Sequence, residues 1–136
     1  MMHVVVGVMI SAEGEVLIAQ RPADKYKPGL WEFPGGKVEP GEGAFKALQR
    51  ELHEEIDIQV ESAVPWMQVK YDYGDRKVLL DTWRVTKFMG EPHGAEGQEV
   101  RWEKIENLIR YEFPAGNKLI LERLRENFLL RRIDLF

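Results

Sequence analysis

The stretch from Gly35 to Ile58, GGKVEPGEGAFKALQRELHEEIDI, determines how the rest of the chain is interpreted. Its second half predicts one amphipathic helix, from about Ala44 to Glu55. Apolar side chains recur at three- and four-residue spacings and share one face of it: Phe45, Leu48, Leu52 and Ile56. Roughly a third of a turn away lies a second face, which carries three glutamates: Glu51, Glu54 and Glu55.

The three glutamates stand where a helix gains no stability from them. Carboxylates at i, i+3 and i+4 repel one another by roughly 0.2–0.5 kcal/mol per pair, and the helix dipole disfavours negative charge in the last turn. Arg50 can pair with Glu54, but one arginine does not neutralise three carboxylates. Because sequences break local rules mainly where function requires it, we interpret this face as a site for a divalent cation such as Mg²⁺. A solvated acidic face is the alternative.

Two turns rich in glycine and proline come before the helix, Pro34-Gly35-Gly36 and Pro40-Gly41-Glu42-Gly43. Turns of this composition allow the main chain to approach a ligand closely and can aim a carbonyl oxygen at it. They favour the cation site over the solvated face.

The spacing of these residues resembles the Nudix box, G-x5-E-x7-R-E-U-x-E-E-x-G-U, in which U is a bulky aliphatic residue. Eight positions agree in register: Gly36, Glu42, Arg50, Glu51, Leu52, Glu54, Glu55 and Ile58. Asp57 stands where the box has its last glycine. A glycine would supply a left-handed residue at the helix end, and aspartate tolerates that conformation better than most other residues. We therefore expect a slightly strained helix exit and intact chemistry.

Length and composition are those of an ordinary globular protein, and we expect one domain over residues 1–136. The absence of cysteine excludes disulfides and thiolate metal sites. No apolar run has the length of a membrane span and no signal peptide is visible, so we expect no membrane partner and a cytoplasmic location. The net charge of −4 argues against a nucleic acid polymer as partner, but not against nucleotides bound through a metal.

Strands dominate the remaining pattern. The predicted strands are His3–Ile10 and Val16–Gln20 as an opening hairpin, Trp31–Phe33, Gln59–Val69 with a break at Pro65, Tyr71–Tyr73, Lys77–Lys87 and Val100–Glu103. Residues 21–30 and 88–99 are expected to be loops, because both are rich in proline or glycine. This pattern predicts an α/β fold in which helices pack on a mixed sheet. The resemblance implies more specifically a Nudix α-β-α sandwich with a central mixed β-sheet.

The C-terminal part predicts a helical turn at Ile105–Leu108 and a last helix from about Asn117 to Phe128. Its inward-facing residues are expected to be Leu119, Ile120, Leu124 and Phe128. The tail Leu129–Phe136 mixes apolar and charged residues and is expected to pack on the domain or on a partner subunit, so a monomer or a weak dimer is expected.

The Nudix resemblance implies metal-assisted hydrolysis of a nucleoside diphosphate linked to another group. Mg²⁺, for which Mn²⁺ can substitute, polarises phosphoryl oxygens and helps to deprotonate water. The implied ligands are the Gly36 carbonyl, Glu51, Glu54 and Glu55. Glu51 either ligates the metal or acts as general base on the water, and the sequence does not separate these roles. Arg50 is expected to orient a glutamate, and Lys37 to reach a phosphate.

Other stretches resemble the MutT-type branch of the family. They are Arg21, the run EFPGGK at Glu32–Lys37, Glu91-Pro92 with Glu96-Gly97-Gln98, and Phe113-Pro114 with Asn117. Glu96 is expected to add a metal ligand or a base, and Arg21 and Phe33 to bind substrate, although Phe33 can equally be a core residue. The amide of Asn117 donates and accepts at once, which suits the edge of an oxidised guanine. Its alternative role is a helix N-cap.

The leading functional hypothesis is therefore a Mg²⁺-dependent nucleoside triphosphate diphosphatase for oxidised purines. Its chief substrate would be 8-oxo-dGTP, released as the monophosphate and pyrophosphate, in sanitation of the nucleotide pool. A pyrimidine, CTP-type pyrophosphohydrolase is the second hypothesis, since Arg21-Pro22-Ala23 and GLWEF at Gly29–Phe33 resemble that branch as well. A non-catalytic nucleotide-binding Nudix module is the third, and the intact glutamate face argues against it.

Overall fold

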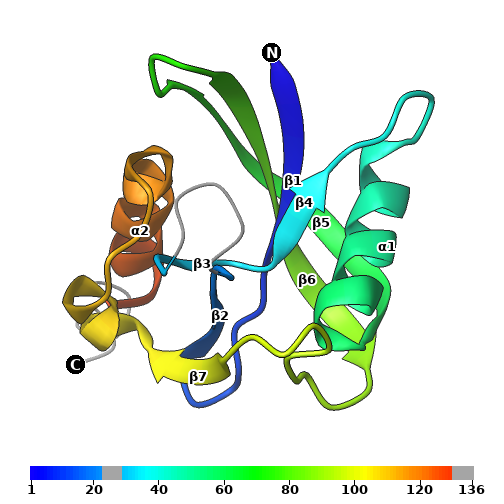
Figure 1. The fold of residues 1–136 in the computed structure, drawn as a ribbon. Helices are drawn as coiled ribbons and strands as arrows, with labels where there is room; N and C mark the ends of the chain where they lie inside the picture. The colour runs from blue at the N-terminus through cyan, green and yellow to red at the C-terminus, as the bar shows by residue number, and fades with distance from the viewer. Residues whose placement is uncertain (23–28, 130–136) are drawn as a thin grey trace.

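The computed structural model describes residues 1–22 and 29–129, and Figure 1 shows how their strands and helices are arranged. The strands are β1 Met2–Val8, β2 Glu15–Gln20, β3 Trp31–Glu32, β4 Gly35–Lys37, β5 Gln59–Asp72, β6 Lys77–Met89 and β7 Val100–Lys104. The α-helices are α1 Ala44–Ile56 and α2 Lys118–Leu124. Short helical turns are η1 Ile105–Arg110 and η2 Ala115–Asn117, both 3₁₀, and η3 Arg125–Leu129, which is π-helical.

The valine-rich strand β1 organises the larger sheet, whose strand order is β4-β1-β6-β5. It runs antiparallel to β4 and parallel to β6, so this sheet is mixed, as the sequence predicted. Val5 lies between Gly36 on one side and Asp81 on the other. A smaller antiparallel sheet has the order β3-β2-β7.

Helices cover both faces of the larger sheet, and α1 and α2 lie on opposite sides in Figure 1. Successive side chains of β1 point to opposite faces, which divides the core into two clusters. The cluster under α1 includes Val5, Leu48, Leu52 and Ile56. The cluster under α2 includes Val6, Leu80, Ile120 and Leu124. The predicted α-β-α sandwich is confirmed.

The predicted hairpin of the first two strands is wrong. Ile10 and Val16 form an isolated antiparallel bridge, but β1 then joins one sheet and β2 the other. The predicted break at Pro65 is also wrong, because β5 continues through it with register shifts on both sides. A proline is tolerated there because β5 is the edge strand of its sheet.

Three further predictions need correction. Gly35–Lys37 is the strand β4 and not a turn, and a Cβ atom on Gly35 would lie 2.0 Å from the Val5 carbonyl oxygen. The last helix is interrupted, since α2 is flanked by η2 and η3. Leu119 is 54% exposed, because it shares its stripe of α2 with Arg123 while Ile120 and Leu124 form the buried stripe. Phe128 is partly buried, as predicted.

Two predicted segments, the loop at 21–30 and the tail at 129–136, fall largely outside the described residues, which leave out 23–28 and 130–136. Within the described ranges, no helix is both long and apolar enough to cross a membrane.

The exit of α1 is strained in the way that the sequence predicted. Asp57 has φ 56° and ψ 42°, and it is the one non-glycine residue with positive φ among the described residues. Its N–H donates to the His53 carbonyl oxygen at 3.1 Å and so ends the helix. The backbone of Asp57 therefore adopts a left-handed conformation that glycine adopts at lower cost.

We predict that Asp57→Gly stabilises the protein by about 0.5 kcal/mol, since relief of left-handed strain outweighs the extra freedom of glycine in the unfolded chain. Asp57→Ala is the matched control and should destabilise it by about 1 kcal/mol, since alanine lacks the polar side chain that eases this conformation. Chemical denaturation of the three proteins measures both effects. An Asp57→Gly protein less stable than Asp57→Ala would contradict the prediction.

Candidate active site

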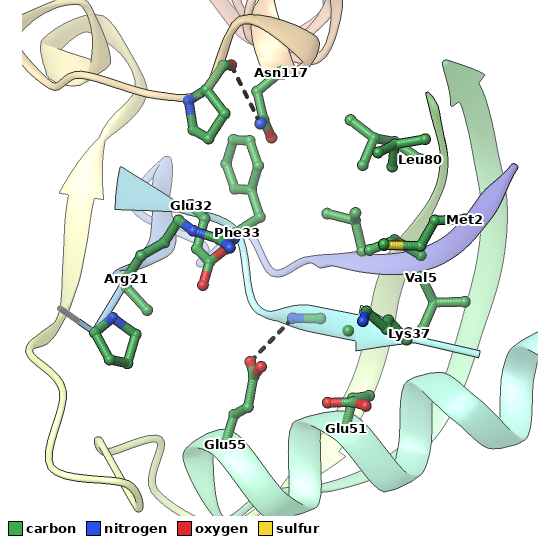
Figure 2. Close-up of a pocket in the computed structure, with 18 of the residues that line it drawn as sticks. Met2, Val5, Arg21, Glu32, Phe33, Lys37, Glu51, Glu55, Leu80 and Asn117 are labelled. Atoms are coloured by element: carbon green, nitrogen blue, oxygen red, sulfur yellow. Dashed lines mark hydrogen bonds and ion pairs between the residues drawn. The ribbon is translucent and has the colours of Figure 1, made fainter. Parts of the chain in front are cut away.

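A pocket of about 600 Å³ opens between the two sides of the fold, and almost all predicted site residues line it. They are Arg21, Phe33, Gly36, Lys37, Glu51, Glu54, Glu55, Glu96 and Asn117. Figure 2 shows Phe33 and Asn117 on one side of the pocket and Glu51 and Glu55 on the other. The pocket therefore has a carboxylate end on α1 and an aromatic and amide end near α2.

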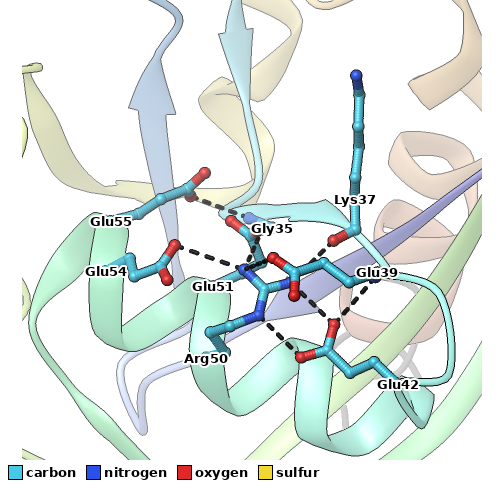
Figure 3. Close-up of polar contacts among 8 residues, drawn as sticks. All are labelled: Gly35, Lys37, Glu39, Glu42, Arg50, Glu51, Glu54 and Glu55. Carbon is cyan, nitrogen blue, oxygen red and sulfur yellow. Dashed lines mark hydrogen bonds and ion pairs between the residues drawn. The ribbon is translucent and has the colours of Figure 1, made fainter.

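Arg50 lies behind the carboxylate end and organises it (Figure 3). Its Nε and Nη2 donate to the two carboxylate oxygens of Glu42 at 2.8 and 2.9 Å, and Nη1 donates to Glu51 at 2.8 Å. Nη2 also donates to the Lys37 carbonyl oxygen at 3.0 Å, which ties α1 to β4. The bond from Arg50 lowers the pKa of Glu42 to about 2, and the bond to Glu42 raises the pKa of Arg50. This geometry fits the predicted orienting role of Arg50.

Gly36 allows the carboxylate of Glu51 to lie directly against β4. A Cβ atom at position 36 would be 2.3 Å from the Glu51 carboxylate, so any other residue there would force this carboxylate to move away from β4. Burial raises the pKa of Glu51, although its bond with Arg50 opposes that shift. The glycine therefore allows the main chain of β4 and the Glu51 carboxylate to lie in contact at this end of the pocket.

Glu55 lies in a different electrostatic environment from Glu51. Its carboxylate accepts the Gly35 N–H at 3.1 Å, and no arginine bonds to it among the described residues. Burial, followed by the negative charge of Glu32, raises the pKa of Glu55 from its ordinary 4.5 to about 9, and Glu51 and Glu96 add to the effect. Uncompensated negative charge at a buried carboxylate is the condition that a bound cation relieves.

The loop between β6 and β7 brings Glu96 to the same end. His93 N–H donates to the Ile56 carbonyl oxygen at 3.1 Å, and Ala95 N–H donates to that of Glu55 at 3.0 Å. The side chain of Gln98 adds a third bond, from Nε2 to the Glu55 carbonyl oxygen at 2.9 Å. These donors satisfy the free carbonyl groups at the end of α1, so one contact caps the helix and places the loop.

The oxygen donors at this end suit Mg²⁺ in type and charge. Among the residues described, however, no three acidic or histidine side chains lie close enough together to hold a metal ion. Glu54 is more than half exposed and contacts Arg50 only at 3.5 Å, so its side chain is free to turn towards the pocket. The donor set is thus present, and ligation requires side chains to rotate.

The other end of the pocket combines an aromatic floor with a buried amide. Phe33 is 3% exposed and packs on Phe113, with ring centroids 5.2 Å apart, so it is a core residue that also faces the pocket. Asn117 is 7% exposed, and its side chain makes no capping bond to α2. Its Nδ2 donates weakly to the Pro114 carbonyl oxygen at 3.4 Å. Asn117 therefore occupies the N-cap position of α2, as the alternative predicted, but its amide makes no capping bond and lines the pocket instead.

Sequence reasoning gave no role to several pocket residues. Glu32 pairs with Arg21, and Tyr73 and Arg76 reach the pocket from the turn between β5 and β6. Glu32 lies inside a stretch that was singled out, so its acidity beside Glu55 was a usable signal. Tyr73 and Arg76 gave no such signal, because a hairpin end carries no indication of what it contacts.

Comparisons with known proteins agree with this geometry. The model of the NUDIX domain family matches residues 5–123. The 8-oxo-dGTP diphosphatase of Escherichia coli (strain K12) is 34% identical over 124 residues, which cover 91% of this chain and 96% of that protein. The CTP pyrophosphohydrolase of the same strain is 36% identical over 118 residues, 87% of each chain.

Solved structures show the same fold. One comes from a study of MutT from Aliivibrio salmonicida and Vibrio cholerae, with a TM-score of 0.77 and 37% identity, covering 90% of this chain and 94% of that one. The MutT protein from Methanosarcina mazei Go1 has a TM-score of 0.81 at 27% identity, covering 93% and 95%.

The raised pKa of Glu55 predicts how stability depends on pH in the metal-free protein. Because the folded pKa of about 9 lies above the ordinary 4.5, the contribution of protonated Glu55 is complete below about pH 4.5 and is lost as the pH rises through 9. In that window the free energy of unfolding falls by up to about 1.4 kcal/mol per pH unit. Glu55→Gln is neutral throughout, so its melting temperature should fall less between pH 6 and pH 9.

Glu13→Gln, in the exposed turn before β2, is the control and should follow the wild type. Melting curves in a chelating buffer measure all three proteins. Parallel pH profiles for wild type and Glu55→Gln would show that Glu55 is not the group responsible.

Proposed function

The chain belongs to the Nudix family of hydrolases, which act on phosphoric anhydrides, and from this we propose that it is a nucleoside triphosphate diphosphatase that prefers 8-oxo-dGTP. The products would be 8-oxo-dGMP and pyrophosphate. The observation that carries the proposal is the buried amide of Asn117, which faces the pocket opposite the carboxylate end and takes no part in capping.

Asn117 supports an oxidised guanine over an unmodified one by its hydrogen-bonding capacity. Its amide offers both a donor and an acceptor, and its one hydrogen bond within the described protein, to Pro114, is long. A buried polar group that a substrate satisfies discriminates strongly against substrates that leave it unpaired. Phe33 supplies an apolar surface beside it for the ring of the base.

The carboxylate end supports the phosphate chemistry. Gly36, Glu51, Glu54 and Glu55 would hold Mg²⁺ or Mn²⁺, with Glu96 as a further ligand or base. The metal, when bound, supplies charge neutralisation at the phosphates and a more acidic water. Arg50 bonds to both Glu51 and Glu42 and so holds Glu51 in place, and Lys37 of β4 lines the pocket, where it can meet a phosphate. Arg21 is held by Glu32 at the pocket wall.

A pyrimidine triphosphate is the second candidate substrate, since the CTP pyrophosphohydrolase matches this chain as well as the 8-oxo-dGTP diphosphatase does. A binding module without activity is disfavoured, because the carboxylate end keeps a mutually repelling set of acidic side chains. We further propose that the enzyme acts in the cytoplasm on free nucleotides, as a monomer or weak dimer, with no nucleic acid polymer as partner.

Neutralising either of two glutamates should strongly lower turnover while preserving the fold. We predict that Glu54→Gln and Glu55→Gln each lower kcat by at least about 10²-fold in saturating Mg²⁺. Each substitution replaces a carboxylate that would bind the metal ion with a neutral amide. Pyrophosphate release measures the effect, and Glu122→Gln on exposed α2 is the control. Near-wild-type turnover in either variant would remove that residue from the ligand set.

Substrate choice tests Asn117. We predict that Asn117→Ala lowers the ratio of kcat/KM for 8-oxo-dGTP over dGTP roughly ten-fold, because one hydrogen bond of about 1.4 kcal/mol is lost. Asn117→Asp should also lose the ratio, since an ionised aspartate cannot donate. Asn107→Ala is the control, because Asn107 bonds to Glu103 away from the pocket. An unchanged ratio in both Asn117 variants would give the pyrimidine candidate equal weight.

A further inference from the structure

The position of Asn117 depends on how the turn before it is held. Asn117 ends the 3₁₀ turn η2, which leads directly into α2. The first N–H groups of a helical segment have no partner within it and need one from elsewhere. Here the partner of the Gly116 N–H is the hydroxyl oxygen of Tyr73, at 2.9 Å and 43 residues away in the chain.

Tyr73 is itself held in place by the turn between β5 and β6. Its N–H donates to the Arg76 carbonyl oxygen at 2.8 Å, and the next N–H, of Gly74, donates to the Asp72 carboxylate at 2.8 Å. The ring of Tyr73 packs on that of Tyr71, with centroids 4.6 Å apart. The hydroxyl is therefore presented from a well-braced hairpin end.

Gly116 fits against both tyrosines because it has no side chain. A Cβ atom there would lie 2.6 Å from the Tyr73 hydroxyl oxygen and 3.3 Å from the Tyr71 Cβ. Any larger residue would displace the hydroxyl or the turn. Gly116 therefore meets Tyr73 both through the hydrogen bond of its N–H and through the close packing that the absence of a Cβ atom allows.

We infer that Tyr73 is a positioning residue for substrate choice, whose hydroxyl fixes Gly116 and thereby the amide of Asn117 in the pocket. This inference rests on the proposed function, since it gives Tyr73 its effect through the base-reading role of Asn117. Tyr73 reaches the pocket from the turn between β5 and β6, whereas Asn117 lies directly before α2. The contact therefore joins the sheet to the helical layer at the aromatic and amide end of the pocket.

The test is the substrate ratio of Tyr73→Phe, which removes one oxygen atom and keeps the ring. We expect the ratio of kcat/KM for 8-oxo-dGTP over dGTP to fall about five-fold, because a displaced amide loses part of its bond to the base. Tyr71→Phe is the matched control and should keep the wild-type ratio, since Tyr71 meets Gly116 through Cβ and Cγ, which phenylalanine retains. Gly116→Ala should lower the ratio as Tyr73→Phe does.

A double mutant separates positioning from general destabilisation. If Tyr73 acts only through Asn117, the Tyr73→Phe, Asn117→Ala protein should have the same ratio as Asn117→Ala alone, within about two-fold. A lower melting temperature for Tyr73→Phe with an unchanged ratio would mean that the bond is merely structural, and the inference would fail. Independent, additive losses would also overturn it.

Two measurements distinguish failure of this inference from failure of the proposed function. The wild-type enzyme on a nucleotide panel tests the function: a preference for CTP would refute 8-oxo-dGTP as the substrate, and the inference as stated would fall with it. Hydrogen exchange of the Gly116 amide, followed by NMR, tests the contact whatever the substrate. Exchange should be faster in Tyr73→Phe than in Tyr71→Phe, and equal rates would overturn the inference.

Discussion

The approach of two carboxylates to two successive glycines of β4 is the constraint on which the site depends. Glu51 and Glu55 project from α1 onto Gly36 and Gly35 of β4, and Gly36 leaves no room for a Cβ atom beside Glu51. The same strand pairs with β1, whose Val5 packs under α1. Helix, strand and core are therefore fixed relative to one another through the site itself.

Electrostatics divides the carboxylates of α1 into two kinds. Glu51 is oriented by Arg50, whose other donors bond to Glu42 and the Lys37 carbonyl oxygen, and this bond opposes but does not cancel the rise in the Glu51 pKa on burial. Glu55 faces Glu32 and Glu96 with only a main-chain N–H for support, and burial with these neighbouring charges raises its pKa to about 9. One helix thus carries an oriented carboxylate and a strongly perturbed one, a few residues apart, and perturbed carboxylates of this kind cluster at functional sites.

The carboxylate end could be predicted because its spacing is local. The helix, its buried stripe and the left-handed Asp57 all follow from periodicity and end chemistry within a few turns. Three features were not predicted, because each depends on residues distant in sequence. They are the separation of β1 from β2, the pairing of Gly35–Lys37 with β1, and the contact of Tyr73 with Gly116. Leu119 was predicted to face the core but is exposed, because the direction of its side chain depends on how η2 leads into α2.

The two ends of the pocket are held by separate contacts, and this separation has a consequence for how specificity can change. The carboxylate end depends on α1, β4 and the loop that caps α1. The aromatic and amide end depends on the β5–β6 turn and the segment before α2. Substitutions at Tyr73, Gly116 or Asn117 therefore alter contacts in which Arg50 and its carboxylates take no part. Relatives named for an oxidised purine and for a pyrimidine match this chain to similar degrees. This is expected if related enzymes retain the carboxylate end and differ at the aromatic and amide end.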